Sequence, residues 1–220
     1  MTDVSAEFDR QRLQMVADQI AEPLDSRPPV RDKRVLHAMR IVPRHRFVDE
    51  QTADLAYIDR PLPIGHGQTI SQPYIVAFMT ELLETAPEHD VLEVGTGCGY
   101  QAAVLAELVR HVYTIEIVQP LAQEAKSTLE KLEYENISVR AGDGYLGWPD
   151  AAPFDRIILT AAPDHIPQPL VDQLKTGGRM VLPVGEIWST QQLTLVTKDE
   201  AGNVNQQAVM AVGFVPLTRR

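Results

Sequence analysis

Cysteine is almost absent from this 220-residue chain, which contains only Cys98. An intramolecular disulfide is therefore impossible, and a reducing compartment fits this composition. No apolar run approaches the length of a membrane span, and the first residues lack the basic and then apolar pattern of a secretory signal. We therefore expect a soluble cytoplasmic protein with no membrane partner.

Positive charge is also scarce, with 20 Lys and Arg residues against 30 Asp and Glu residues, a formal charge of −10. This balance argues against a nucleic-acid partner. The chain also lacks a Gly-x-Ser-x-Gly nucleophile motif, and its histidines show neither zinc-binding nor triad spacing. They are His37, His45, His66, His89, His111 and His165. We therefore expect no metal site.

Glycine, in contrast, recurs at every second position in one short segment, residues 95–99. The apolar run Val91 to Val94 is followed by Gly95, Gly97 and Gly99, and then by small and apolar residues at helical spacing. This pattern predicts a strand, a tight turn and a helix. Glycines let the backbone approach a ligand closely, and the free amides that begin the next helix face it. We expect this loop to hold a nucleotide-like molecule.

Three interpretations of this loop compete. It could be a glycine turn that only packs a helix on a strand. It could bind a dinucleotide, because Gly97, Gly99 and Ala102 fit G-x-G-x-x-G/A, although that motif alone is weak. It could bind S-adenosylmethionine, for which the pattern is acid-x-Gly-x-Gly-x-Gly, with Glu93 as the acid. We favour the third interpretation, because a carboxylate suits a cationic aminoacyl group better than a pyrophosphate.

Strands and helices alternate after the loop, as expected for a doubly wound, Rossmann-like α/β sheet that is mostly parallel. The last two strands are predicted to form an antiparallel hairpin at the sheet edge. The predicted strands after the glycine loop are 112–117, 137–141, 154–160, 179–184, 192–197 and about 208–216. Helical patterns at 5–21 and 32–39 make residues 1–60 a helical extension packed on a domain of residues 61–220, in one folding unit.

Acidic residues fall at three predicted strand ends, where an open α/β sheet binds its ligand. Glu93 lies in the glycine loop. Glu116 follows Gly99 by 17 residues, a position from which a carboxylate accepts both ribose hydroxyls. Asp143 follows the next strand, where it could accept the adenine amino group. This third acid favours S-adenosylmethionine over a dinucleotide.

The segment Asp59 to Tyr74 is rich in turn-forming residues and leads into a predicted helix over 73–83, with proline in its first turn. Ser71 is a candidate N-cap for this helix. The same loop is also a candidate wall of the ligand site, with the hydroxyls of Thr69 and Ser71 pointing inward. The two roles are compatible.

Over nearly its whole length the chain resembles the protein-L-isoaspartate O-methyltransferases. The most specific motif is Gly67-Gln68-Thr69-Ile70-Ser71-Gln72-Pro73. Further matches are Val42-Pro43-Arg44, Phe47-Val48, Leu62-Pro63-Ile64-Gly65, the glycine loop, Gly142-Asp143-Gly144, Pro153-Phe154-Asp155, Gly177-Gly178-Arg179, Leu182-Pro183-Val184-Gly185 and Val215-Pro216-Leu217-Thr218. Cys98 departs from the family, in which serine is common there.

The resemblance implies a repair enzyme that methylates the free α-carboxylate of L-isoaspartyl residues in damaged proteins and peptides. We expect the protein to be a monomer. The ester then closes to a succinimide, which reopens partly to normal aspartate. S-adenosyl-L-methionine is the implied cofactor, and S-adenosyl-L-homocysteine is the product. The implied cofactor-binding residues, with the glycine loop included, are Thr69, Ile70, Ser71, Glu93, Gly95, Gly97, Gly99, Glu116, Asp143, Gly144 and Thr218. Ser71 matches the catalytic serine, and Leu182, Pro183 and Val184 would join it in binding substrate.

Methyl transfer to a carboxylate agrees with the lack of an obvious general base in the sequence. A carboxylate nucleophile is already ionised at neutral pH and needs no general base, so catalysis is mostly positioning. We expect Ser71 to orient the carboxylate by a hydrogen bond. A methyltransferase of small molecules and a binding protein without turnover remain alternatives, and the motif from Gln68 to Pro73 argues against both.

Overall fold

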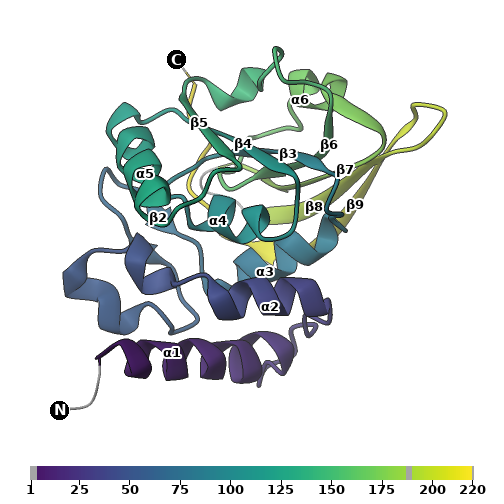
Figure 1. Ribbon diagram of the computed structural model, residues 1–220. Coiled ribbons are helices and arrows are strands. Elements are labelled where there is room, and N and C mark those ends of the chain that lie inside the picture. The colour runs from purple at the N-terminus through teal and green to yellow at the C-terminus, as the bar shows by residue number, and fades with distance from the viewer. Residues whose placement is uncertain (1–3, 187–189, 220) are drawn as a thin grey trace.

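The computed structural model describes residues 4–186 and 190–219 and contains one large sheet (Figure 1). Its seven strands are arranged in the order β5-β4-β3-β6-β7-β8-β9. They are β3 (Asp90–Val94), β4 (His111–Glu116), β5 (Ile137–Ala141), β6 (Phe154–Leu159), β7 (Leu174–Val184), β8 (Gln191–Lys198) and β9 (Val204–Val212). Neighbours from β5 to β7 pair in parallel, whereas β8 and β9 are antiparallel. The predicted doubly wound sheet with an antiparallel edge is confirmed.

Helices cover both faces of the sheet because its strands bury alternate residues on opposite sides. On β3, Val91 belongs to a hydrophobic core shared with the helices of one face, whereas Leu92 and Val94 belong to a second core on the other face. The first core includes side chains of α3 (Pro73–Leu82), α4 (Tyr100–Ala106) and α5 (Gln119–Lys131). The second includes Leu170 of α6 (Gln168–Asp172).

The N-terminal helices pack on the same side as α3 (Figure 1). They are α1 (Val4–Met15), its continuation η1 (Val16–Ala21), α2 (Lys33–Ile41), and the short turns η2 (Arg44–Phe47) and η3 (Glu50–Leu55). Asp32 begins α2 as its N-cap, accepting hydrogen bonds from the backbone N–H groups of Arg34 and Val35. Met15, Val16 and Ile20 are fully buried in the first core, so the predicted helical extension shares its core with the sheet. Residues 1–3 of that extension lie outside the described residues.

Two strands differ clearly from the predicted bounds. Strand β7 begins at Leu174 instead of residue 179, because it continues through the two glycines at 177–178. Strand β9 occupies 204–212 instead of 208–216. The reason is the short turn after β8, in which the Asp199 side chain accepts N–H bonds from Ala201 and Asn203. The exposed polar residues that follow this turn hide the strand from pattern analysis.

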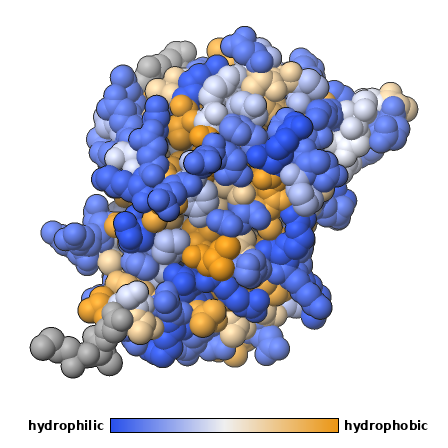
Figure 2. All heavy atoms as spheres, in the orientation of Figure 1, coloured by the Kyte–Doolittle hydropathy of each residue, from blue (hydrophilic) through white to orange (hydrophobic). Residues whose placement is uncertain are grey.

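The outer surface matches the acidic, polar composition. Figure 2 shows a mostly hydrophilic face on which hydrophobic residues appear as separate patches. Within 4–186 and 190–219, no helix has both the length and the apolar character needed to cross a bilayer.

Candidate active site

The glycine loop joins β3 to α4 at the carboxyl edge of the sheet. Gly95, Gly97 and Gly99 all have positive φ, at 101°, 53° and 91°. The backbone N–H groups of Gly95 and Thr96 donate to Ile115 O at the end of β4. The loop is therefore tied to the neighbouring strand, and its backbone lines the space outside the strand ends.

Gly95 lies against the end of β6, where no side chain fits. A Cβ placed on Gly95 would overlap the hydroxyl of Thr160. That hydroxyl donates to Gly95 O at 2.5 Å, and the Thr160 N–H donates to Val94 O at 2.9 Å. The absence of a side chain at Gly95 thus lets the end of β6 and the glycine loop form one continuous wall.

A narrow cavity of about 50 Å³ opens beside this wall. It brings together side chains and backbone from the sheet edge, from the loop before α3 and from residues 215–218. Six of the predicted cofactor-binding residues line it: Thr69, Gly95, Gly97, Glu116, Gly144 and Thr218. The predicted Gly99 does not line it; it begins α4 and packs against Leu129 of α5.

Glu116 ends β4 and is held in a fixed orientation. One of its carboxylate oxygens accepts from Gly97 N at 2.8 Å, and the other accepts from Val118 N at 2.9 Å. The side chain is almost completely buried, yet it lines the narrow cavity. Since each carboxylate oxygen can accept more than one hydrogen bond, Glu116 can still accept two hydroxyls from a ribose.

Asp143 lies at the next strand end, just before the turn η4 (Gly144–Leu146). Its Oδ1 accepts from Tyr145 N at 3.0 Å. Arg219 stacks over the Tyr145 ring at 3.7 Å and brings its Nε within 3.9 Å of Asp143 Oδ2. Gly144 lines the narrow cavity, and Asp143 stands beside it, so the predicted contact of Asp143 with adenine stays a prediction.

Glu93 is buried under the glycine loop, at 0% exposure. Thr114 Oγ1 donates to Glu93 Oε2 at 2.6 Å and is itself 2.6 Å from Thr96 Oγ1. Burial raises the pKa of Glu93 to about 8, with a smaller contribution from the nearby Glu116 carboxylate. At neutral pH this acid is therefore mostly protonated, and its predicted contact with a cationic aminoacyl group stays a prediction.

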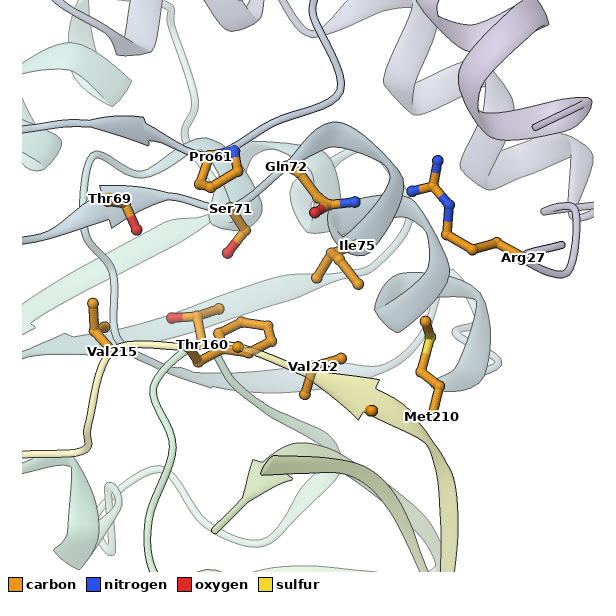
Figure 3. Close-up of a pocket in the computed structure, with 13 residues that line it drawn as sticks. Arg27, Pro61, Thr69, Ser71, Gln72, Ile75, Thr160, Met210, Val212 and Val215 are labelled. Atoms are coloured by element: carbon orange, nitrogen blue, oxygen red, sulfur yellow. The ribbon is translucent and has the colours of Figure 1, made fainter. Parts of the chain in front are cut away.

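The loop before α3 forms the opposite wall. Strand β1 (Leu62–Pro63) pairs with β2 (Thr69–Ile70) as a small hairpin, which places Ser71 directly after β2. Ile70 is buried and anchors the loop. Figure 3 shows the hydroxyls of Thr69 and Ser71 pointing into a second, larger cavity of about 480 Å³. Among the described residues, the Ser71 hydroxyl makes no hydrogen bond.

The predicted role of Ser71 as an N-cap is wrong. Gln72 occupies the cap position of α3 and makes no side-chain cap bond. The carboxylate of Asp59 replaces it, with Oδ1 accepting from Tyr74 N at 2.8 Å. A remote acid thus satisfies the helix start, which leaves the Ser71 hydroxyl available to the cavity.

Thr69 and Thr160 connect the cavities. Both residues line the narrow cavity, the larger cavity, and a small space between them that is also bounded by Ile70, Ser71 and the glycine loop. A ligand in the narrow cavity and another in the larger one would therefore meet at these two threonines. Thr160 was not predicted, although a polar residue at the end of β6, opposite the glycine loop, is the signal that could have identified it.

The predicted substrate-binding residues Leu182, Pro183 and Val184 lie elsewhere. They end β7 and pair with β8, and Leu182 is fully buried in the second core. None of them lines the three cavities described above. The larger cavity is instead bounded by residues 210–215, which sequence analysis missed. Within the described residues, no cluster of three or more His, Cys, Asp or Glu side chains could hold a metal ion.

A family profile and individual relatives of the chain all point to the same protein family. The family profile of protein-L-isoaspartate(D-aspartate) O-methyltransferase matches residues 16–220. Protein-L-isoaspartate O-methyltransferase 2 of Polaromonas sp. is 58% identical over 190 residues, which are 86% of this chain and 90% of the relative. Protein-L-isoaspartate O-methyltransferase 1 of Nitrosospira multiformis is 54% identical over 213 residues, with 97% and 89% covered.

Solved structures have the same fold. A protein-L-isoaspartate O-methyltransferase superposes with a TM-score of 0.78 at 29% identity, covering 85% of this chain and 61% of the solved one. A candidate enzyme of the same name from Plasmodium falciparum, in complex with S-adenosyl-L-homocysteine, superposes with a TM-score of 0.77 at 23% identity over the full length of both chains.

Gly95→Ala should disrupt the site for two separate reasons. An alanine at φ 101° is strained, at a cost of about 1–3 kcal/mol, and its methyl group also collides with Thr160. We expect a lower melting temperature and loss of S-adenosylhomocysteine binding in calorimetry. Gly202→Ala is the matched control, because Gly202 has φ 84° with open space around it. Should the Gly95 variant bind as well as the control, the contact with Thr160 would not shape the cavity.

Glu93→Gln should change how stability depends on pH. Between about 4.5 and about 8 the folded protein holds a proton on Glu93 that the unfolded chain has released. The unfolding free energy therefore falls as pH rises through this window, by up to about 1.4 kcal/mol per pH unit. Glutamine is neutral and can still accept from Thr114. Melting curves from pH 5 to 8 should show the variant gaining on the wild type, and parallel curves would contradict a protonated Glu93.

Proposed function

Because the chain belongs to the protein-L-isoaspartate(D-aspartate) O-methyltransferase family, we propose that it methylates the free α-carboxylate of L-isoaspartyl residues in damaged proteins. The resulting ester closes to a succinimide, with loss of methanol, and water reopens this ring partly to normal aspartate. One observation carries the proposal: the unbonded Ser71 hydroxyl faces a large cavity that meets the glycine-loop cavity at Thr69 and Thr160.

The residues around the narrow cavity support a site for S-adenosyl-L-methionine at this edge of the sheet. Gly95 and Gly97 line this cavity, so the backbone of the glycine loop forms part of its wall. Glu116 would accept the ribose hydroxyls, and Gly144 and Thr218 would border the adenine end. When bound, this cofactor would supply an electrophilic methyl group on a positively charged sulfur. Transfer of that methyl group to a carboxylate oxygen of the substrate would convert the cofactor to S-adenosyl-L-homocysteine.

The residues of the chain act by positioning. Ser71 donates a hydrogen bond to the substrate carboxylate and points one of its oxygens toward the methyl group. The hydroxyl of Thr160 is committed to Gly95 O, so this residue holds the end of β6 against the glycine loop where the two cavities meet. A carboxylate and a sulfonium lose their charges in the reaction, and a site that excludes water favours this neutralisation. No general base is required.

We also propose that the protein acts as a monomer in the cytoplasm. Every residue to which this proposal gives a role belongs to this chain, so the proposed reaction requires no residue of a second subunit. The single cysteine suits a reducing compartment.

The direct test is radiolabelled methyl transfer from S-adenosylmethionine to an isoaspartyl peptide, with the corresponding aspartyl peptide as the control. Activity on the first peptide alone supports the proposal. Equal activity on both peptides, or on neither of them, contradicts it.

Glu116→Ala should weaken cofactor binding. Loss of the carboxylate leaves ribose hydroxyls unpaired, at a cost of about 1–3 kcal/mol. The change also removes the acceptor for Gly97 N and Val118 N, so we expect a lower melting temperature as well. Calorimetry well below that temperature isolates the loss of S-adenosylhomocysteine affinity, with Glu130→Ala on the exposed side of α5 as the control. An unchanged dissociation constant would refute the ribose contact.

Ser71 variants should separate orientation from stability. Since Ser71 does not cap α3, Ser71→Ala should keep the melting temperature and S-adenosylhomocysteine affinity while kcat falls. Ser71→Asp places a negative charge against the incoming carboxylate and should be close to inactive, although it still folds and binds S-adenosylhomocysteine. Ser127→Ala on α5 is the matched control. Near wild-type turnover by Ser71→Asp would mean that Ser71 does not face the substrate.

A further inference from the structure

Arg27 stands out in the wall of the larger cavity. Of the described residues that line this cavity, it is the one with a charged side chain. Its charge is positive in a protein whose formal charge is −10. Figure 3 shows Arg27 at the opposite end of the cavity from Ser71 and Thr160, with Ile75 and Met210 nearer to it. The cavity thus extends well beyond the space that one carboxylate needs.

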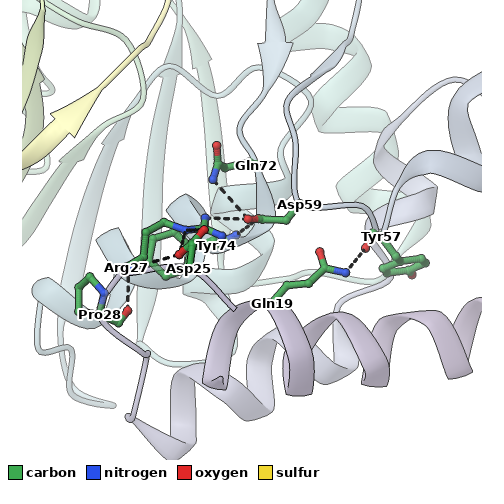
Figure 4. Close-up of polar contacts among 8 residues, drawn as sticks. All are labelled: Gln19, Asp25, Arg27, Pro28, Tyr57, Asp59, Gln72 and Tyr74. Carbon is green, nitrogen blue, oxygen red and sulfur yellow. Dashed lines mark hydrogen bonds and ion pairs between the residues drawn. The ribbon is translucent and has the colours of Figure 1, made fainter. Parts of the chain in front are cut away.

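The guanidinium of Arg27 is held in a defined position. Its Nε donates to both carboxylate oxygens of Asp25, at 2.8 and 2.7 Å, and its Nη1 donates to Asp59 Oδ2 at 2.7 Å. The group also stacks over the Tyr74 ring, with Cζ 4.1 Å from the centroid. Tyr74 is fixed in turn by a bond from its hydroxyl to Pro28 O (Figure 4). A long side chain is immobilised at the cavity edge before any ligand arrives.

These contacts decide which ligand chemistry suits Arg27. Two carboxylates already balance its positive charge, so the group offers directed N–H donors more than net charge. The hydrogen bonds to Asp25 and Asp59 use Nε and Nη1, and within the described part of the chain Nη2 makes no hydrogen bond. The side chain is 23% exposed. A neutral acceptor such as a main-chain carbonyl oxygen fits this arrangement better than an acidic side chain.

We propose that Arg27 forms a subsite that binds a main-chain carbonyl of the substrate peptide, in a residue flanking the isoaspartyl residue. The inference rests on the function proposed above. An enzyme that acts on damage in many proteins meets varied flanking side chains, whereas the main chain is common to all of them. Arg27 is therefore a positioning residue that strengthens peptide binding without touching the reacting atoms.

A purely structural role for Arg27 makes a different prediction. Asp59 accepts hydrogen bonds from Arg27, from Tyr74 N at the start of α3 and, at 3.4 Å, from Gln72 next to Ser71. If Arg27 only supported Asp59, its loss would disturb Ser71 and lower kcat for every substrate. A subsite instead affects KM, and only for peptides long enough to reach it.

The experiment compares Arg27→Met with the wild type on two isoaspartyl peptides. One has a single alanine on each side and blocked ends, and the other has four alanines on each side, so no acidic flank contributes. For the long peptide we expect KM to rise about tenfold with kcat nearly unchanged, as for loss of one charge-assisted hydrogen bond. For the short peptide, kcat/KM should stay within twofold. Arg10→Met, which removes the exposed pair with Glu7, is the control.

Two further measurements keep the test decisive. Arg27→Lys retains a cation beside Asp59 but lacks the planar fork, so it should keep kcat near the wild-type value and still show the raised KM. Affinity for both peptides, measured with S-adenosylhomocysteine present, tests the subsite without turnover. If the wild type binds the long peptide more tightly than the short one but methylates neither peptide, the proposed function is contradicted and the subsite is not. Equal losses of kcat on both peptides, or unchanged length dependence in binding, would overturn the subsite.

Discussion

The contact between the glycine loop and the end of β6 determines the shape of the site. Parallel pairing brings the carboxyl ends of β3, β4 and β6 to one edge. Thr160 then donates from both its backbone and its hydroxyl to the loop that leaves β3. This arrangement requires a residue without a Cβ at Gly95. Thr160 lines both cavities, so they meet where the end of β6 contacts the glycine loop.

The second half of the site depends on the helical extension. Asp59 satisfies the start of α3 and accepts from Arg27, so one carboxylate links the segment before α2 to the Ser71 loop. The residues before the sheet therefore contribute to the larger cavity as well as to the core. In the described residues, the narrow cavity is built from the sheet edge, the loop before α3 and the segment after β9.

Sequence patterns predicted the sheet and its antiparallel edge, because the spacing of strands and helices is a local signal. Gly95, Gly97 and Glu116, which glycine spacing and position at a strand end singled out, line the narrow cavity. The missed features depend on long-range contacts. Asp59 replaces Ser71 at the helix start across 15 residues of chain, and Arg27 reaches the cavity through a pairing 32 residues away. Burial of Glu93 likewise follows from packing against Thr114, which its motif does not reveal.

The position of residues 210–218 has a consequence for synthesis. Residues 210–215 border the larger cavity, and Pro216 and Thr218 border the narrow one, whereas the glycine loop precedes them by more than a hundred residues. During translation, residues 210–218 are synthesised after strands β3 to β7. Both cavities therefore lack part of their lining until these residues have been added and packed against the sheet edge.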